Sequence, residues 1–216
     1  MKYSLVLLVC FIILCSLSFC TIHASEDKIN KILIYIDPGH GGVDPGVVIN
    51  NIYEKDINLK ISFALKEKLE QNNIEVLMTR SGDYDLGTPK ATYRKKSDFD
   101  HRIQLINDSK ADYYLSIHLN YLSDSSYYGP QVFYNDTFET NKILADKIQK
   151  TLNEKIGTNR QIKKIPNSTY MYSKLDIPGV LIECGFLSNV NERKKLLTES
   201  YIDEFTSYLV DVFKNF

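Results

Sequence analysis

Short apolar runs alternate with amphipathic helical segments along most of this chain, and this alternation restricts the fold more than any other feature. Continuous apolar runs at 32–36, 113–117 and 180–182 indicate strands that are buried on both faces. Apolar residues between Ile57 and Leu69 recur at three- and four-residue steps, which predicts a helix over about 54–71. Doubly buried strands that alternate with helices are typical of parallel sheets. We therefore predict a single α/β domain with a mostly parallel, twisted sheet and helices on both faces.

The same patterns predict the remaining elements of the domain. Further strands are expected at 74–78 and 131–134, and further helices at 98–107, 143–156 and 202–213. A long polar loop is expected over 80–97, because this stretch contains glycine and proline and no periodic apolar residues. Long loops in compact domains often carry function.

Charge and composition exclude several classes of protein. The chain has 216 residues, enough for one domain with a core of its own. Its 26 Lys+Arg are balanced by 27 Asp+Glu, which argues against a nucleic-acid-binding protein because those usually carry a basic excess. With 44% hydrophobic residues, the chain is also too apolar to be disordered.

Residues 1–24 have the layout of a secretory signal peptide. Lys2 precedes an apolar run from Leu5 to Phe19, and Ala24 stands at a tolerable cleavage site. An uncleaved membrane anchor is the alternative, since the run from 5 to 22 is just long enough to span a bilayer. We expect export across the cytoplasmic membrane in either case, with any membrane contact made through this segment and with 25–216 as the functional domain.

The cysteines limit how the exported domain is stabilised. Three of the four cysteines lie in the leader, so Cys184 is alone in the domain. A lone thiol forms no internal disulfide, and it excludes a structural zinc site built from several thiolates. We interpret Cys184 as a packed small apolar residue rather than a nucleophile.

Four ionisable residues are expected at one edge of the sheet. His40 follows the first strand, Glu54 begins the next helix, and His118 and Glu183 come directly after the strands at 113–117 and 180–182. In an open parallel sheet, ligands bind beyond the carboxyl ends of the strands. Residues far apart in the sequence should therefore meet there.

This set matches the requirements of a catalytic zinc site. Two imidazoles and one carboxylate commonly bind zinc and leave a position for water, whose pKa the ion lowers to about 7. His40, Glu54 and His118 supply those ligands, and Glu183 supplies a second carboxylate that could carry a proton. The alternatives are structural histidines, a helix-terminal glutamate and an ordinary ion pair. Residue patterns leave these alternatives open.

Two neighbouring residues also compete for roles in such a site. His101 lies near the start of a helix that faces the same edge, so topology does not exclude it as a metal ligand. Arg102 either binds an anionic substrate in the groove or belongs to a solvated helix face. The glycines between 39 and 46 lack the spacing of a phosphate loop or a dinucleotide fingerprint, which argues against nucleotide binding.

Four segments together resemble a known enzyme family. IDPGHGG at 36–42, EKDINL at 54–59, LSIHLN at 115–120 and IECGFLSN at 182–189 are similar to the motifs of zinc-dependent N-acetylmuramoyl-L-alanine amidases of bacterial cell walls. The resemblance runs in order from about Ile32 to near the C-terminus. The segments 94–102, 117–120, 129–134 and 141–142 resemble the germination-specific subgroup of spore-forming bacteria.

The resemblance implies specific roles. His40, Glu54 and His118 would hold one Zn²⁺, Glu183 would be the catalytic carboxylate, and His101 would have no metal role. We further expect Arg102 and Asn120 to bind substrate. The reaction would be hydrolysis of the amide between the lactyl group of muramic acid and L-alanine. It would take place in the cell wall or spore cortex, as a step towards muramic-δ-lactam. An accessory protein partner is also expected, because no wall-binding domain is recognisable.

Two other functions remain open on the sequence. A zinc peptidase of different wall-peptide specificity would use the same metal ligands. A non-catalytic peptidoglycan-binding protein could retain the scaffold, although an intact Glu183 argues against it.

Overall fold

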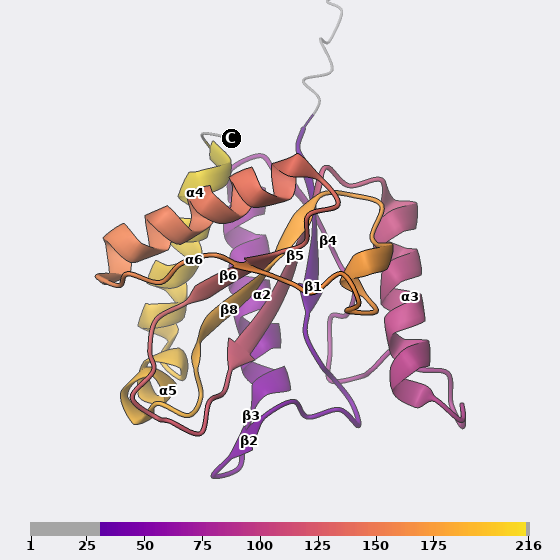
Figure 1. Cartoon of the computed structure of the whole chain (residues 1–216), viewed down its shortest axis with the longest axis horizontal. Coiled ribbons are helices and arrows are strands. Elements are labelled where there is room, and N and C mark those ends of the chain that lie inside the picture. Colours follow the sequence, from indigo (N-terminus) through magenta and orange to yellow (C-terminus); the bar gives the residue numbers. More distant parts are fainter. Residues whose placement is uncertain (1–30, 215–216) are drawn as a thin grey trace, which may run out of the picture. The chain divides into compact units, whose positions relative to one another are not determined.

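The structure is a computed structural model that describes residues 31–214, and it is built around a six-stranded sheet (Figure 1). The strand order is β4-β1-β5-β8-β6-β7, and a separate two-stranded sheet joins β2 to β3. All strand pairs of the main sheet are parallel except β6 with β8. The strands are β1 Leu33–Pro38, β2 Val48–Ile49, β3 Ile52–Tyr53, β4 Glu75–Met78, β5 Tyr113–Asn120, β6 Gln131–Tyr134, β7 Lys163–Lys164 and β8 Gly179–Phe186.

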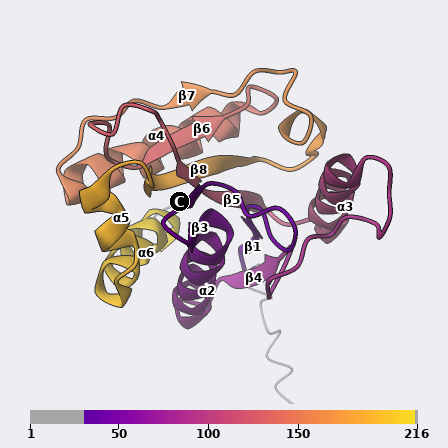
Figure 2. The same cartoon turned by 90° about the horizontal axis from the view of Figure 1, so that it is seen from below.

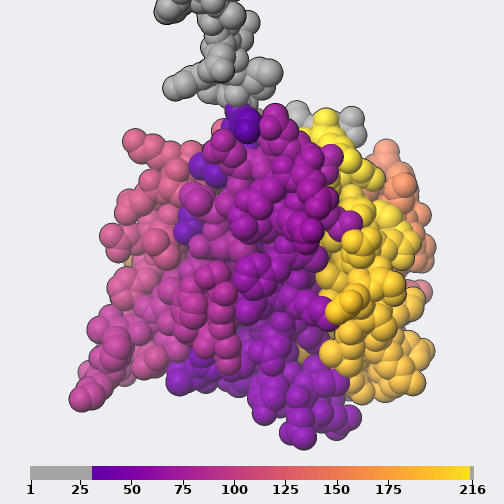
Figure 3. Space-filling view, turned by 180° about the vertical axis from the view of Figure 1, so that it is seen from behind, coloured from indigo at the N-terminus to yellow at the C-terminus, as the bar shows by residue number. Residues whose placement is uncertain are grey.

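Helices cover both faces of this sheet, as predicted. Figure 2 shows α3 on one side of the sheet and α2 and α6 on the other. Figure 3 looks onto the second side, where α2 (purple) and α6 (yellow) lie next to each other. The helices are α2 Glu54–Gln71, α3 Arg94–Ser109, α4 Glu139–Ile156, α5 Val190–Leu196 and α6 Glu199–Lys214, with a short 3₁₀ turn, η1, at Tyr172–Lys174.

Strand alternation divides the core into two layers. Ile34, Leu115 and Ile182 point to the side of α2, α4 and α6, where they join the larger cluster of buried apolar residues. Their neighbours Tyr35 and Tyr114 point the other way, into a smaller cluster beneath α3 and η1. Side chains alternate between the two faces of a sheet along each strand, and this alternation also decides on which face His118 and Glu183 lie. Both belong to the α3 side of the sheet.

Several boundaries differ from the sequence prediction. Helix α2 covers the predicted range, but α3 begins at Arg94 rather than at 98, because its first turn has no apolar side chain to mark it. Strands β5 and β8 continue to Asn120 and Phe186, so His118 and Glu183 lie within strands and not after them. Polar side chains interrupt the apolar pattern, while backbone pairing continues through them. The short elements β2, β3, β7 and α5 were not predicted.

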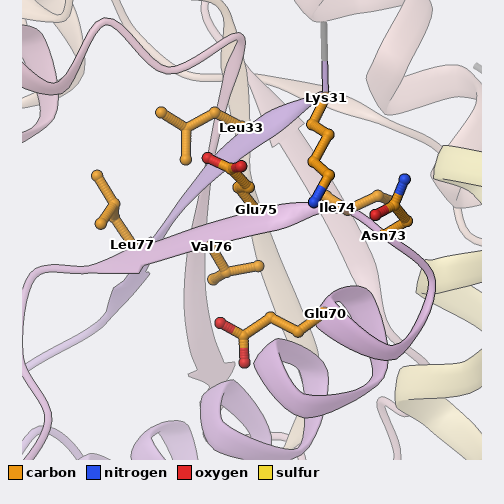
Figure 4. A pocket seen from close by; sticks show the side chains of 8 residues that line it. All are labelled: Lys31, Leu33, Glu70, Asn73, Ile74, Glu75, Val76 and Leu77. Atoms are coloured by element: carbon orange, nitrogen blue, oxygen red, sulfur yellow. The ribbon is translucent and has the colours of Figure 1, made fainter. Parts of the chain in front are cut away.

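A cavity of about 440 Å³ lies beside the edge strand β4, far along the strands from His40. Figure 4 shows that it is lined by the start of β1, the end of α2 and β4, with Lys31, Glu70 and Glu75 as its charged residues. No histidine, cysteine or serine is among its lining residues, and we assign it no function.

The leader of 1–24 and its cleavage site at Ala24 lie outside the described residues, so the prediction of a signal peptide or anchor stays a prediction. Within 31–214, none of the helices is long and apolar enough to cross a membrane.

Candidate metal centre

His40 is held in a tight turn directly after β1. The turn is closed by two backbone hydrogen bonds between Gly41 and Asp44, and the backbone of His40 has a φ of 63°. This left-handed conformation is uncommon for a residue with a side chain. Nδ1 of His40 lies 3.0 Å from Oδ2 of Asp44, and its Nε2 lies 3.1 Å from Oε1 of Glu54. The turn thus directs one ring nitrogen at each carboxylate.

Glu54 begins α2 and is almost fully buried, at 2% exposure. Its Oε1 lies 3.2 Å from Nδ1 of His118 and also accepts hydrogen bonds from Leu119 N and Asn58 Nδ2. Burial disfavours the carboxylate, but the hydrogen bonds from His118 and His40 outweigh it and hold the pKa of Glu54 far below its usual range. Glu54 is therefore ionised.

The same contacts affect His40. Burial disfavours its charged form, but the hydrogen bonds to Asp44 and Glu54 prevail and raise its pKa to about 9. The imidazole rings of His40 and His118 meet edge to face, with their centroids 5.0 Å apart.

His118 and Glu183 are brought together by the register of β5 and β8. The two residues are Cα partners across this parallel pair, and both side chains lie on the α3 side. Oε2 of Glu183 is buried and has no hydrogen-bond partner. Burial and, to a lesser degree, the nearby Glu54 raise the pKa of Glu183 to about 7, against the opposing effect of the two histidines. A carboxyl group with a pKa near neutrality is suited to proton transfer.

The donor set fits a zinc ion. One ligand atom from each of His40, Glu54 and His118 lies within 4.8 Å of the other two. Zinc–ligand bonds of about 2.0–2.2 Å in a tetrahedral site place ligand atoms roughly 3.3–3.6 Å apart. The Glu54 oxygen lies at slightly shorter distances, 3.1 and 3.2 Å, from the ring nitrogens of His40 and His118. The contact from His40 to Asp44 is the carboxylate–histidine pairing that often orients a zinc ligand. These three residues could therefore hold one metal ion.

Arg102 lies beneath the His40 turn and is 2% exposed. Its guanidinium donates to both buried carboxylates, Asp37 and Asp98, and to the backbone carbonyls of Pro38 and His40. The structure thus contradicts a solvated helix face at Arg102. Binding of an anionic substrate by Arg102 stays a prediction, since this side chain also lines a cavity next to the site.

Arg80 supports the same turn from the other side. Its guanidinium is 1% exposed and donates to the carbonyls of Pro38 and Gly39. Burial, together with repulsion from Arg102, lowers the pKa of Arg80 to about 10. Sequence reasoning missed Arg80 and Asp44. Arg80 follows the end of β4 by two residues, so the rule that ligands bind beyond strand ends could have found it.

The remaining candidates lie in three different environments. Asn120 lines the groove that also contains His40, Glu54 and His118. His101 is outside the group of metal-ligating atoms, and its Nδ1 lies 2.6 Å from the carbonyl of Leu86. Cys184 is fully buried among the apolar residues on the α2 side, and burial raises the pKa of its thiol well above the usual value. It is a core residue, as expected.

Two histidines and a glutamate around a common point, beside a carboxyl oxygen that has no hydrogen-bond partner, form a set of groups that metal-dependent hydrolases commonly use. Comparison with known proteins identifies the family. Residues 34–212 match the N-acetylmuramoyl-L-alanine amidase family, and this chain belongs to it. Members of the family are amidases, and this chain is an enzyme of that kind.

Individual relatives agree with this assignment. The chain is 39% identical over 179 residues to the germination-specific N-acetylmuramoyl-L-alanine amidase of Bacillus subtilis, covering 81% of this chain and 75% of that protein. It is 32% identical to the amidase LytC of the same organism, of which it covers 34%. The CwlD amidase from Clostridioides difficile, solved in complex with the GerS lipoprotein, superimposes with a TM-score of 0.80 at 35% identity, over 86% of this chain and 98% of CwlD.

Proposed function

We propose that this chain is an exported, zinc-dependent N-acetylmuramoyl-L-alanine amidase of the spore cortex, with 25–216 as its catalytic domain. The observation that carries the zinc site is the single Glu54 oxygen, which lies within 3.2 Å of a ring nitrogen from both His40 and His118. We assign His40, Glu54 and His118 as ligands. A zinc ion bound there supplies a Lewis acid that polarises a carbonyl oxygen and lowers the pKa of water.

The chain's own carboxyl group moves the proton. Glu183 accepts a proton from the attacking water as the water oxygen bonds to the lactyl carbonyl carbon. It then donates that proton to the alanine nitrogen as the C–N bond breaks, giving a lactyl carboxylic acid and a peptide with a free amino terminus. The unpaired Oε2 of Glu183 and its pKa of about 7 support both halves of this transfer.

Product analysis tests the reaction. Digestion of purified cortex peptidoglycan should release stem peptides that begin with L-alanine, as identified by mass spectrometry, and a chelator should stop their release. Cuts inside the peptide would instead identify a zinc peptidase. Binding to sacculi with no released product would identify a wall-binding protein. The buried, ionised Glu54 and the free Glu183 oxygen favour the amidase over this last alternative.

Two variants separate proton transfer from metal binding. Glu183→Gln should retain zinc and lose activity by about 10²–10⁴-fold, the usual size of general acid–base catalysis. His118→Ala should lose zinc, as measured by metal analysis. Activity retained in the first variant, or an unchanged zinc content in the second, would remove the corresponding role.

The relatives suggest the physiological setting. The Bacillus subtilis relative is named germination-specific, and CwlD was solved with a lipoprotein. We infer that this amidase also acts on the cortex and associates with an accessory lipoprotein. A tagged form of this chain should co-purify with a lipoprotein from sporulating cells. Deletion of the gene for this chain should remove muramic-δ-lactam from the cortex.

A further inference from the structure

The cavity between α3 and the segment that contains η1 has no assigned occupant. We propose that it binds the first residues of the stem peptide, and that Lys95 at its rim pairs with the carboxylate of the residue after L-alanine. This subsite rests on the amidase function proposed above. It would give the enzyme a preference that depends on the charge of the stem peptide.

The cavity opens directly from the metal centre. Its volume is about 310 Å³, within the range of about 300–1,000 Å³ that is common for ligand sites. Its lining includes His40, His118 and Glu183 of the candidate metal centre, Lys95 and Phe99 of α3, and Tyr170 and Met171 from the segment before η1. A short segment that extends from the metal centre into this cavity would therefore meet both charged side chains and the rings of Phe99 and Tyr170.

The glycan has a different route. A second, shallower depression of about 440 Å³ shares His40, His118 and Glu183 with the cavity, and it contains Asn120 and Tyr121. Tyr121 also lines a neighbouring groove of about 590 Å³, whose other lining residues include serines and exposed apolar side chains. A polymer of sugar rings needs a long surface groove with hydroxyl and aromatic contacts, whereas the peptide is a short branch. The smaller cavity therefore suits the peptide.

Charged side chains also distinguish the cavity beside α3 from the groove that contains Tyr121. The Lys95 side chain is 58% exposed, and its Nζ lies 2.6 Å from Asp44 and over the Phe99 ring. An ammonium group has three donors, so the contact with Asp44 leaves capacity for a ligand carboxylate. Arg102 also lines the cavity, but its guanidinium is directed at Asp37, Asp98 and backbone carbonyls. In the groove, Arg193 donates to the carbonyl of Leu187.

The test compares two substrates that differ in one charge. In peptidoglycan the residue after L-alanine is a glutamate joined through its side chain, and its α-carboxylate is either free or amidated. We expect the zinc-loaded protein to cleave N-acetylmuramoyl-L-alanyl-D-glutamate with a kcat/KM about fivefold above that of the isoglutamine analogue, the upper size for a partly exposed ion pair. Lys95→Gln should reduce this ratio to near one.

The ratio separates substrate recognition from other effects of the variant. Lys95 also contacts Asp44, the partner of His40, but any loss of metal would lower the rates of both substrates equally. Lys96→Gln is the matched control, because Lys96 is 55% exposed, pairs with Asp100 and does not line the cavity. It should retain the wild-type ratio.

Three results would overturn the subsite. The first is equal cleavage of both substrates by the wild type. The second is a kcat/KM ratio that Lys95→Gln leaves unchanged. The third is a ratio that falls equally in Lys95→Gln and Lys96→Gln, since this would reflect only the general charge of α3. Cleavage of neither substrate by the zinc-loaded wild type would instead overturn the proposed zinc-dependent reaction, and the subsite with it.

Discussion

Position 39 shows how a single residue shapes the candidate metal centre. A Cβ built on Gly39 would lie 2.2 Å from Cε1 of His118 and 2.4 Å from its Nε2, far closer than atoms approach without a bond. The His118 ring therefore rests directly on the backbone of the turn that carries His40. Glycine is required here for this close approach, which sets the separation of the two rings.

Gly39→Ala should accordingly displace His118 and weaken zinc binding by at least tenfold, as measured by competition with a chromogenic chelator. Gly157→Ala is the control, since Gly157 has a φ of 78° and no atom within 4 Å of a built Cβ. It should cost about 1–2 kcal/mol of stability through backbone strain, with no change in zinc affinity. Equal zinc affinity in the wild type and Gly39→Ala would contradict this role of Gly39.

At the scale of elements, a buried ion pair connects α3 to β1. Nη1 of Arg102 lies 2.6 Å from Oδ1 of Asp37, and Asp37 also accepts hydrogen bonds from Thr79 and Ser116. Burial disfavours the Asp37 carboxylate, but Arg102 and Thr79 outweigh this effect, and the pKa of Asp37 lies below its usual range. A carboxyl group with a lowered pKa in the folded state stabilises the fold above its unfolded pKa. That contribution is lost as the pH falls through the folded pKa.

Asp37→Asn should therefore destabilise the protein at pH 7 by about 3 kcal/mol, because it leaves the buried Arg102 with one carboxylate fewer. Denaturant unfolding from pH 7 to pH 3 should show the stability gap between wild type and variant shrinking below about pH 4, the unfolded pKa of aspartate. Below that pH the unfolded wild type binds a proton at Asp37, whereas the folded wild type keeps its carboxylate down to its lower folded pKa. A gap that stays constant down to pH 3 would show that the Asp37 charge contributes nothing to stability.

For the whole molecule, the candidate metal centre joins parts of the chain that are distant in sequence. His40 follows β1, Glu54 begins α2 and His118 lies in β5, so a bound ion would tie the start of the domain to its middle. An ion that binds the folded chain and not the unfolded chain stabilises the fold by mass action.

Zinc at 100 times its Kd should raise stability by about 2.7 kcal/mol, which for a domain of this size raises Tm by about 5–10 °C. Differential scanning calorimetry with zinc and with a chelator measures this shift. Glu183→Gln should keep the shift and His118→Ala should lose it. The same Tm in zinc and in chelator would argue against the proposed site.

The order and type of the main elements were readable from the sequence, since strands buried on both faces and one-sided helices follow from hydrophobic periodicity alone. Periodicity also placed four ionisable residues at one edge of the sheet, and the motifs around them identified the amidase family. Hydrophobic periodicity could not predict the strand register, because polar residues within β5 and β8 interrupt the apolar pattern while the backbone hydrogen bonding continues. The pairing of His118 with Glu183 therefore appeared only in the fold.

The environment of each side chain was likewise decided by tertiary structure. Arg102 and His101 are adjacent in the sequence but lie in different environments. Arg102 is buried beneath the His40 turn, whereas Nδ1 of His101 is within hydrogen-bond distance of the carbonyl of Leu86. The raised pKa of Glu183 comes from burial, which depends on the chain segments that surround it in space. Sequence by itself determined which chemical groups are present and which strands carry them. Folding decided which of those groups meet, because contact and burial depend on long-range packing that no local pattern encodes.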